Sequence, residues 1–326
     1  MDVVILGAGA LGSILGAHLA QAGHGVSLIA RGRRAAQVSE HGLRISGLAD
    51  ITVTCPVITD PSAVSKAELL IVTVKTYDTQ SAVEALPKGA FNSVFSVANG
   101  VLKNRQLAAH FGDASVLGCM ANTSGELLDD GEVKFTRNVC LHIGELDQPA
   151  SRRVKGIAQA IADSGVNALV EDDIQTIEWS KFVGWAAIFV LAVTTRAATG
   201  KFLAEANCAR LAATMIREMG AIASASNIEI IDQSPVPVAS IVNGSLDDGQ
   251  QILMDMGRQW TEAAPGHRLS ALQDLERRKR LEVEETLGFA VQEAARLNID
   301  VPTLATCYTL IAGVNGANVA STLISA

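Results

Sequence analysis

The feature that most constrains the fold is a glycine pattern that directly follows an apolar segment at the N-terminus. Residues 3–6 are apolar, and Gly7-Ala8-Gly9-Ala10-Leu11-Gly12 comes next, opening a helical pattern over residues 10–21. The first glycine permits a tight turn, the second lets a pyrophosphate approach the backbone, and the third allows close packing of helix on strand. The helix N-terminus adds free N–H groups and a positive dipole. We therefore predict a dinucleotide site at Gly7, Ala8, Gly9, Ala10, Leu11 and Gly12; the alternative is a tight turn that binds nothing.

The end of the second predicted strand, residues 26–29, bears on which dinucleotide binds. A carboxylate at this point would bind the adenosine ribose hydroxyls and repel a 2′-phosphate. Arg31 stands there instead, and a guanidinium binds phosphate through a forked pair of charge-assisted hydrogen bonds. We predict NADPH (NADP) rather than NADH, with Arg31 as a ligand. Arg33 and Arg34 are expected to lie in a solvated helix start.

Short β-branched segments alternate with helical patterns in the first half of the chain, which is typical of a parallel sheet covered by helices. The predicted strands of this sheet are residues 3–6, 26–29, 69–74, 94–97 and 116–119. An antiparallel hairpin region, a helix and a closing strand are expected next, at residues 123–128 with 133–143, then 151–162 and 166–170.

The pattern changes after Asp172, where strand signals nearly vanish. Long segments of helical periodicity follow, at residues 178–198, 204–226, 236–246 and 280–297. We predict an α/β domain with a Rossmann-type doubly wound sheet over residues 1–172, which binds NADP, and an all-α substrate and catalytic domain over residues 173–326.

Two polar residues end predicted strands in the first domain. Lys75 follows Val-Thr-Val, and Asn99 follows Ser-Val-Ala. Ligands of parallel sheets bind beyond the carboxyl ends of the strands, so the lysine could bind a substrate carboxylate or the cofactor ribose, and the asparagine could orient the nicotinamide or the substrate. Position alone supports equally a solvated lysine and a simple turn at Asn99-Gly100.

Lys181 is the only charged residue between Glu178 and Arg196. Residues spaced by four share a helix face, so Lys181, Trp185 and Phe189 are expected to point roughly the same way. A half-buried lysine is costly unless it is paired or functional. In a carbonyl reduction, an ammonium group near the oxygen stabilises the developing negative charge and donates the proton. The alternative is a helix-end lysine paired with Glu178.

Composition excludes several function classes. Of 326 residues, 26 are Lys or Arg and 34 are Asp or Glu, a net charge of −8, which is the wrong sign for binding nucleic acid. Aromatic residues make up only 4%, too few for platforms that stack bases. The histidines and the five cysteines lack metal-ligand spacing, so no metal is expected and the thiols are expected to be idle in a reducing cytoplasm.

Membrane association is not expected either. The N-terminus has an acid where a signal peptide has a base, and glycines where an apolar stretch should lie. The apolar run at residues 182–193 is too short to cross a bilayer and predicts a buried helix. The uncharged segment from Val301 onward could be a docked helix or a floppy tail, with a membrane span the least favoured. The apolar second domain is compatible with a homodimer.

With these residues assembled, the chain resembles the ketopantoate reductase (2-dehydropantoate 2-reductase) family over residues 1 to about 310. The matching pieces are GAGALG, Arg31, VTVK ending at Lys75, ANG at Asn99 and EWSK ending at Lys181, followed by LSALQDLERRKRLEVEETLG and by NIDVP at residues 298–302. Their order and spacing agree with the family across both predicted domains.

The resemblance implies an NADPH-dependent reduction of a 2-oxo acid to a 2-hydroxy acid, with 2-dehydropantoate and pantothenate biosynthesis as the first expectation. It implies that Lys181 is the general acid, that Glu282 binds the substrate's hydroxyl group and that Ser270 binds its carboxylate. Lys75 and Asn99 would hold the substrate and the nicotinamide together. The implied fold, a Rossmann domain followed by a helical domain, agrees with the pattern of elements described above.

The chain departs from the family at the predicted pocket. The family usually has asparagines four and eight positions after the catalytic lysine, where this chain has Trp185 and Phe189, and a threonine where it has Leu281. Aromatic rings remove hydrogen-bond donors and fill volume, which weakens the case for ketopantoate itself. The alternatives are a 2-hydroxy acid dehydrogenase for a bulkier apolar or aromatic 2-oxo acid, two rings of the ordinary core, or a dinucleotide-binding protein without turnover.

Overall fold

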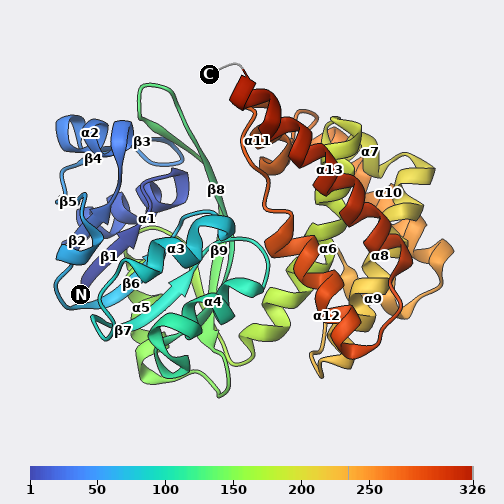
Figure 1. The fold of residues 1–326 in the computed structure, drawn as a ribbon, viewed down its shortest axis with the longest axis horizontal. Helices are drawn as coiled ribbons and strands as arrows, with labels where there is room; N and C mark the ends of the chain where they lie inside the picture. Colours follow the sequence, from blue (N-terminus) through green and yellow to red (C-terminus); the bar gives the residue numbers. More distant parts are fainter. Residues whose placement is uncertain (234, 325–326) are drawn as a thin grey trace. The chain divides into compact units, whose positions relative to one another are not determined.

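The structure is a computed structural model that describes residues 1–233 and 235–324. The chain divides into two compact units, Met1–Gln175 and Thr176–Ala326. The first unit contains both sheets and the helices between them, whereas the second is built from helices (Figure 1). An α/β domain followed by a helical domain is therefore confirmed.

A parallel sheet forms the centre of the first unit, with strand order β5-β2-β1-β6-β7. Its strands are β1 (Asp2–Leu6), β2 (Gly25–Ile29), β5 (Val57–Ile58), β6 (Ala67–Val72) and β7 (Phe91–Ser96). Both faces of the sheet are buried: Val3 and Ile5 belong to one apolar core, and Val4 and Leu6 belong to another on the opposite face. Burial on both faces explains why residues 3–6 of β1 and 69–72 of β6 are continuously apolar.

A second sheet has strand order β10-β9-β3-β4, with β8 paired antiparallel to β9. Its strands are β3 (Leu43–Gly47), β4 (Ile51–Val53), β8 (Leu117–Leu127), β9 (Val133–Glu145) and β10 (Ala168–Glu171). The prediction that residues 116–119 form a strand of the parallel sheet is wrong, because these residues lead into β8 and only an isolated bridge joins Val116 to Val94. The long antiparallel ladder with β9 determines where this segment pairs.

The helices of the first unit are α1 (Ala10–Gln21), α2 (Gly32–His41), α3 (Thr76–Glu84), α4 (Leu102–Phe111) and α5 (Arg152–Asp163), with short 3₁₀ turns at Pro61–Ala63 and Asp113–Ser115. Helix α1 packs closely on both sheets, because a Cβ at Gly16 would lie 3.1 Å from Leu43 of β3 and 3.2 Å from Ile5 of β1. The glycine pattern thus lies at the start of a helix that both sheets hold in place.

The second unit contains α6 (Ile174–Thr195), α7 (Thr199–Leu203), α8 (Ala206–Ala225), α9 (Val238–Asn243), α10 (Leu246–Ala263), α11 (Ser270–Glu276), the π-helical turn η3 (Glu284–Gly288), α12 (Phe289–Leu297) and α13 (Pro302–Ile324). The helix predicted at 236–246 ends at Asn243, because Ser245 and Asp248 form a capping box that starts α10. The helix predicted at 280–297 begins only at Glu284.

The long apolar helix α6 is part of a core. Among the described residues it is the one helix that is long and apolar enough to cross a membrane, and 89% of its most apolar window is buried within the protein. The uncharged C-terminal segment forms α13, whose first N–H groups bond to Glu218 of α8. Of the alternatives for this segment, the docked helix is the one observed; residues 325–326 lie outside the described part of the chain.

Candidate functional site

The glycine loop between β1 and α1 is tightly built at its two ends. Gly7 adopts φ +107°, and its N–H donates to the carbonyl oxygen of Ile29 at 3.0 Å. A Cβ at Gly12 would lie 2.1 Å from the Gly7 carbonyl oxygen and 2.5 Å from Oγ1 of Thr73. The fold therefore requires glycine at both positions.

Gly9 differs from Gly7 and Gly12 because the fold does not require a glycine at this position. Its φ of −71° suits any residue, and a Cβ there would meet nothing within 4 Å. It is also the N-cap of α1 and provides no side-chain cap, so the first N–H groups of the helix lack that partner. Open space over an uncapped helix N-terminus fits a dinucleotide pyrophosphate; a tight turn without a ligand would not need glycine here.

Arg34 fixes the shape of this loop, which corrects the expectation that it is solvated. Its Nε donates to the carbonyl oxygen of Ala8 at 2.6 Å, Nη2 to Oγ of Ser13 at 2.8 Å, and Nη1 to the carbonyl oxygen of Gly131 at 2.7 Å. Partial burial, together with nearby Arg44, lowers the pKa of Arg34. The sequence carries no sign of this role, because Gly131 lies almost a hundred positions away, in the turn between β8 and β9.

Arg31 is the exposed N-cap residue of α2 and follows β2. Its carbonyl oxygen accepts the N–H of Ala35 at 3.3 Å, while its guanidinium makes no hydrogen bond or ion pair with any residue that the structure describes. Since β2 is the neighbour of β1 in the sheet, this exposed guanidinium follows the strand next to the one that leads into the glycine loop.

Lys75 and Asn99 follow the next two strands of the same sheet. Lys75 is the N-cap residue of α3, beyond β6, and Asn99 lies in the turn beyond β7; both side chains are half-buried. The strand order β2-β1-β6-β7 therefore brings Arg31, the loop that begins at Gly7, Lys75 and Asn99 to one edge of the parallel sheet, in that order.

Lys103 is a contributor to this edge that sequence reasoning missed. It lies in the first turn of α4 and is only 2% exposed. Its Nζ donates to the carbonyl oxygens of Ala98 at 2.9 Å and Cys119 at 2.5 Å, so it ties the turn that carries Asn99 to β8. A lysine next to Asn104 and Arg105 looks like part of a solvated helix start, and nothing local reveals the buried carbonyl groups that it binds.

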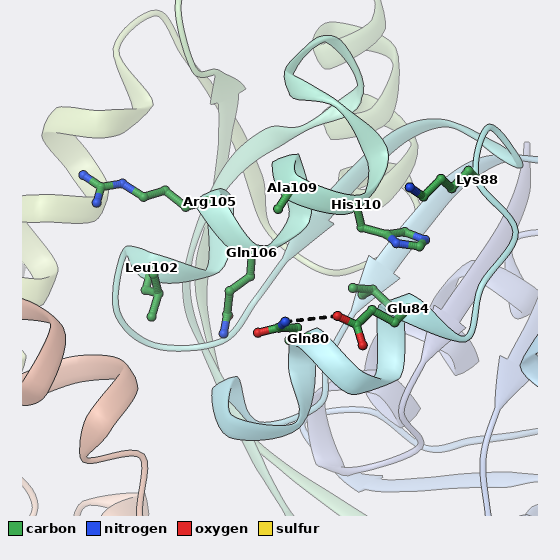
Figure 2. Close-up of a pocket in the computed structure, with 9 residues that line it drawn as sticks. Gln80, Glu84, Lys88, Leu102, Arg105, Gln106, Ala109 and His110 are labelled. Carbon is green, nitrogen blue, oxygen red and sulfur yellow. Dashed lines mark hydrogen bonds between the residues drawn. The ribbon is translucent and has the colours of Figure 1, made fainter.

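A groove of about 520 Å³ lies between α3 and α4 (Figure 2). It is lined by Gln80, Val83, Glu84, Lys88, Leu102, Arg105, Gln106, Ala109 and His110. A hydrogen bond of 3.0 Å joins Gln80 to Glu84 along one wall. None of the predicted site residues lines this groove, so it is a separate depression on the first unit.

In the second unit, Lys181 is half-buried in the second turn of α6. One and two turns further along, the rings of Trp185 and Phe189 stack with their centroids 5.0 Å apart and their planes at 7°. Phe189 is only 1% exposed, whereas Trp185 remains half-buried. Phe189 therefore backs Trp185, and Trp185 is the ring that keeps an accessible surface.

Ser270 begins α11, and Glu282 lies in the irregular segment that follows this helix. Ser270 is the exposed first residue of α11, and Glu282, 8% exposed, lies just before η3 rather than in a helix as expected. Oγ1 of Thr286 donates to the carbonyl oxygen of Glu282. Burial raises the pKa of the nearby Glu285 carboxyl group, whose ion pair with Arg280 spans 3.1 Å.

The described residues contain no group of three His, Cys, Asp or Glu side chains that could hold a metal ion. The five cysteines are free, and burial raises the pKa of the Cys55 thiol to about 11.

Known proteins similar to this chain match it over almost its whole length. The family model described as ketopantoate reductase PanE/ApbA matches residues 3–148, and its C-terminal counterpart matches residues 173–315. A 2-dehydropantoate 2-reductase of Archaeoglobus fulgidus is 31% identical, with 96% of this chain and 97% of the relative covered.

Solved structures agree in fold. A PanE/ApbA family ketopantoate reductase from Ralstonia eutropha has a TM-score of 0.82 at 28% identity, covering 98% of this chain and 99% of its own. A D-mandelate dehydrogenase in a ternary structure with NADH and anilino(oxo)acetate also has a TM-score of 0.82, at 19% identity and with the same coverage. Both family models match and the relatives are full-length, and the chain therefore belongs to the ketopantoate reductase family.

Proposed function

We propose that this protein reduces a 2-oxo acid to a 2-hydroxy acid with NADPH, and that 2-dehydropantoate, reduced to pantoate for pantothenate biosynthesis, is its substrate. The sheet edge carries the proposal, because it holds a glycine loop that is open at Gly9 and has Lys75 and Asn99 on the next two strands. In this assignment residues 1–172 bind the cofactor, and residues 173–326 supply the catalytic group. The activity named for the Archaeoglobus fulgidus relative supports the choice of substrate.

The chemistry divides among few side chains. When bound at the glycine loop, NADPH supplies a hydride to the 2-oxo carbon. The carbonyl oxygen then gains negative charge, and the ammonium group of Lys181 stabilises that charge and donates a proton. Glu282 accepts a hydrogen bond from the substrate's hydroxyl group, and Ser270 donates one to its carboxylate. Lys75 and Asn99 orient the substrate and the nicotinamide.

The test is NADPH oxidation by the purified protein with 2-dehydropantoate and a panel of aliphatic and aromatic 2-oxo acids. Lys181→Ala should lower kcat by about 10²–10⁴-fold, the usual contribution of a positioned general acid, while the NADPH dissociation constant stays unchanged. Unchanged turnover in this variant would exclude Lys181 as the proton donor. Robust NADPH oxidation with any acid of the panel excludes a protein without turnover.

The preference for NADPH rests on Arg31, an exposed guanidinium without a partner among the described residues. Arg31→Met should raise the KM for NADPH about tenfold or more, as expected for the loss of a charge-assisted pair, and leave the KM for NADH within about twofold of wild type. An equal rise in KM for NADPH and NADH would contradict a role of Arg31 in binding the 2′-phosphate.

A second candidate substrate is a bulkier apolar or aromatic 2-oxo acid. The observation that favours it is the stack of Trp185 on Phe189, with Trp185 half-buried on the helix that carries Lys181. The D-mandelate dehydrogenase structure shows that the same fold holds anilino(oxo)acetate in that protein. Trp185→Asn should shift kcat/KM from aromatic acids toward 2-dehydropantoate. Wild-type activity restricted to 2-dehydropantoate would exclude this candidate.

For the state of the protein in the cell, we propose a cytoplasmic homodimer. A structural neighbour from Staphylococcus aureus, with a TM-score of 0.75 and 19% identity, is described as a dimeric ketopantoate reductase. Light scattering on the protein as it elutes from a size-exclusion column should give twice the chain mass of 34.1 kDa. A mass equal to one chain would contradict the dimer.

A further inference from the structure

Helix α13 carries no charged residue, yet three larger polar side chains lie on one of its faces. Tyr308, Asn315 and Asn318 are seven and three positions apart, a spacing that aligns them along one side of a helix. The fully buried side chains of Leu304 and Ile311 lie on the same side. The three polar side chains therefore lie on the side of α13 that packs on the rest of the second unit, and each of them is partly exposed.

The three side chains contact the one segment that carries Glu282. Oδ1 of Asn315 accepts the N–H of Leu281 at 2.9 Å, and Nδ2 of Asn318 donates to the carbonyl oxygen of Lys279 at 3.0 Å. The hydroxyl group of Tyr308 donates to Oε2 of Glu284 at 2.7 Å. The contacts lie on both sides of Glu282 in the chain.

This segment has little regular structure of its own. Residues 277–283 form neither helix nor strand, and Arg278 adopts φ +55°. The following turn η3 is π-helical, a rare conformation often found at functional sites. Backbone groups that lack a regular ladder must find other partners, and here the side chains of Asn315 and Asn318 provide them.

Helix α13 is itself firmly anchored. Both carboxylate oxygens of Glu218, from α8, accept N–H groups at the start of α13, from Thr303 at 3.0 Å and from Leu304 at 2.7 Å. A carboxylate at this point also suits the positive end of the helix dipole. The side chains of Asn315 and Asn318 therefore belong to a helix whose first turn is held in place by α8.

We propose that α13 is a positioning element for the substrate site: Asn315 and Asn318 hold the backbone just before Glu282, and Tyr308 holds the side chain of Glu284 just after it. The carboxylate of Glu282 is then in place before the substrate arrives. The inference rests on the substrate-binding role proposed for Glu282. A group that is already ordered costs less conformational entropy when it binds. Loosening the segment should therefore raise KM more than it lowers kcat.

A matched set of variants tests this role. Asn315→Leu removes the acceptor at similar size, Asn315→Asp keeps an oxygen acceptor, and Thr309→Ala changes an exposed residue whose hydroxyl group bonds within its own helix, to Ala305. Asn315→Leu should raise the KM for 2-dehydropantoate about 3- to 10-fold, the loss of one hydrogen bond, with kcat within about twofold. Hydrogen exchange over residues 279–288 should accelerate in parallel. The other two variants should resemble wild type.

Several results would overturn the proposal. Unchanged exchange in Asn315→Leu would show that the contact does not hold the segment, and faster exchange with a wild-type KM would show a merely structural role. An equal rise in KM and in hydrogen exchange in Asn315→Asp would show that the lost hydrogen-bond acceptor does not cause these effects. Failure of the proposed function looks different: wild type would not turn over 2-dehydropantoate, or Glu282→Gln would leave KM unchanged. In the first case, KM is measured with whichever acid of the panel is reduced.

Discussion

Gly9 and Gly12 belong to one loop, yet the structure gives them opposite reasons to be glycine. At Gly12 a side chain would collide with the backbone of Gly7, whereas at Gly9 a side chain would project into open space. Glycine at position 12 is required by the fold, whereas glycine at position 9 leaves space for the dinucleotide proposed to bind there. Replacing each by alanine separates the two effects.

Gly12→Ala should lower the free energy of unfolding by roughly 1–3 kcal/mol, the cost of forcing atoms into a packed site, and weaken NADPH binding as well. Gly9→Ala should leave the free energy of unfolding within about 0.5 kcal/mol of wild type but raise the NADPH dissociation constant at least about tenfold, because its methyl group fills the space needed by the pyrophosphate. Chemical denaturation and fluorescence titration measure the two quantities. Wild-type affinity in Gly9→Ala would rule out close approach of a dinucleotide at this residue.

The placement of residues that follow strands is predictable from the sequence. Lys75, Asn99 and Arg31 each follow an apolar strand, and the sheet order brings them to one edge; their roles in binding stay a prediction. The contacts of Arg34 and Lys103 are not predictable, because most of their partners are backbone carbonyl groups, among them those of Gly131 and Cys119. Every residue has a backbone carbonyl group, so the sequence does not indicate which of them a side chain will bind.

At the scale of elements, the junction of β9 with α5 depends on one buried carboxylate. The side chain of Glu145 is 2% exposed, and Arg153 binds it at both oxygens, with Nη2 2.5 Å from Oε2 and Nε 2.9 Å from Oε1. Ser151, the N-cap residue of α5, also donates to it. Hydrogen bonds from Arg153 are the main cause that holds the pKa of Glu145 below its ordinary value.

A carboxyl group with a lowered pKa in the folded state stabilises the protein above its unfolded pKa of about 4.3, and this contribution is lost as the pH falls through the folded value. Acid titration of the free energy of unfolding should therefore show a decline below about pH 4.3 that is smaller in Glu145→Gln. Arg153→Met should cost about 3–5 kcal/mol at neutral pH, because it leaves a buried carboxylate without its partner. Identical acid profiles for wild type and Glu145→Gln would contradict this role.

Elements with a clear period were predictable, and those that depend on distant pairing were not. The strands β1, β2, β6 and β7 are predicted by short apolar segments, and the helix α8 is predicted by its helical periodicity. The short strands β3 and β4 were missed, because they gain their partners only by pairing with each other and with β9. The predicted start of α12 at residue 280 is too early, because charged residues typical of helices occupy a segment that forms no helix and bonds instead to the side chains of Asn315 and Asn318.

The whole chain contains two compact units, and the glycine loop belongs to the first. A ligand that binds only the folded state stabilises it by about 2.7 kcal/mol at one hundred times its dissociation constant. NADPH at that concentration should therefore raise the melting temperature by about 5–10 °C, and NADH at the same concentration should raise it less. Gly9→Ala, with its dissociation constant raised about tenfold or more, should show at most about half of the wild-type shift with NADPH. An undiminished shift in this variant would indicate binding elsewhere.

The bond from Arg34 to Gly131 also bears on the order of events during synthesis. Strand β1, the glycine loop and Arg34 leave the ribosome early, but the carbonyl group that completes the guanidinium's set of partners belongs to a turn made almost a hundred residues later. Domains fold vectorially as they are made, and contacts between distant residues form slowly. A nascent chain that ends before Gly131 therefore has every residue of the glycine loop and Arg34, but lacks one of the three hydrogen bonds by which Arg34 links this loop to the rest of the unit.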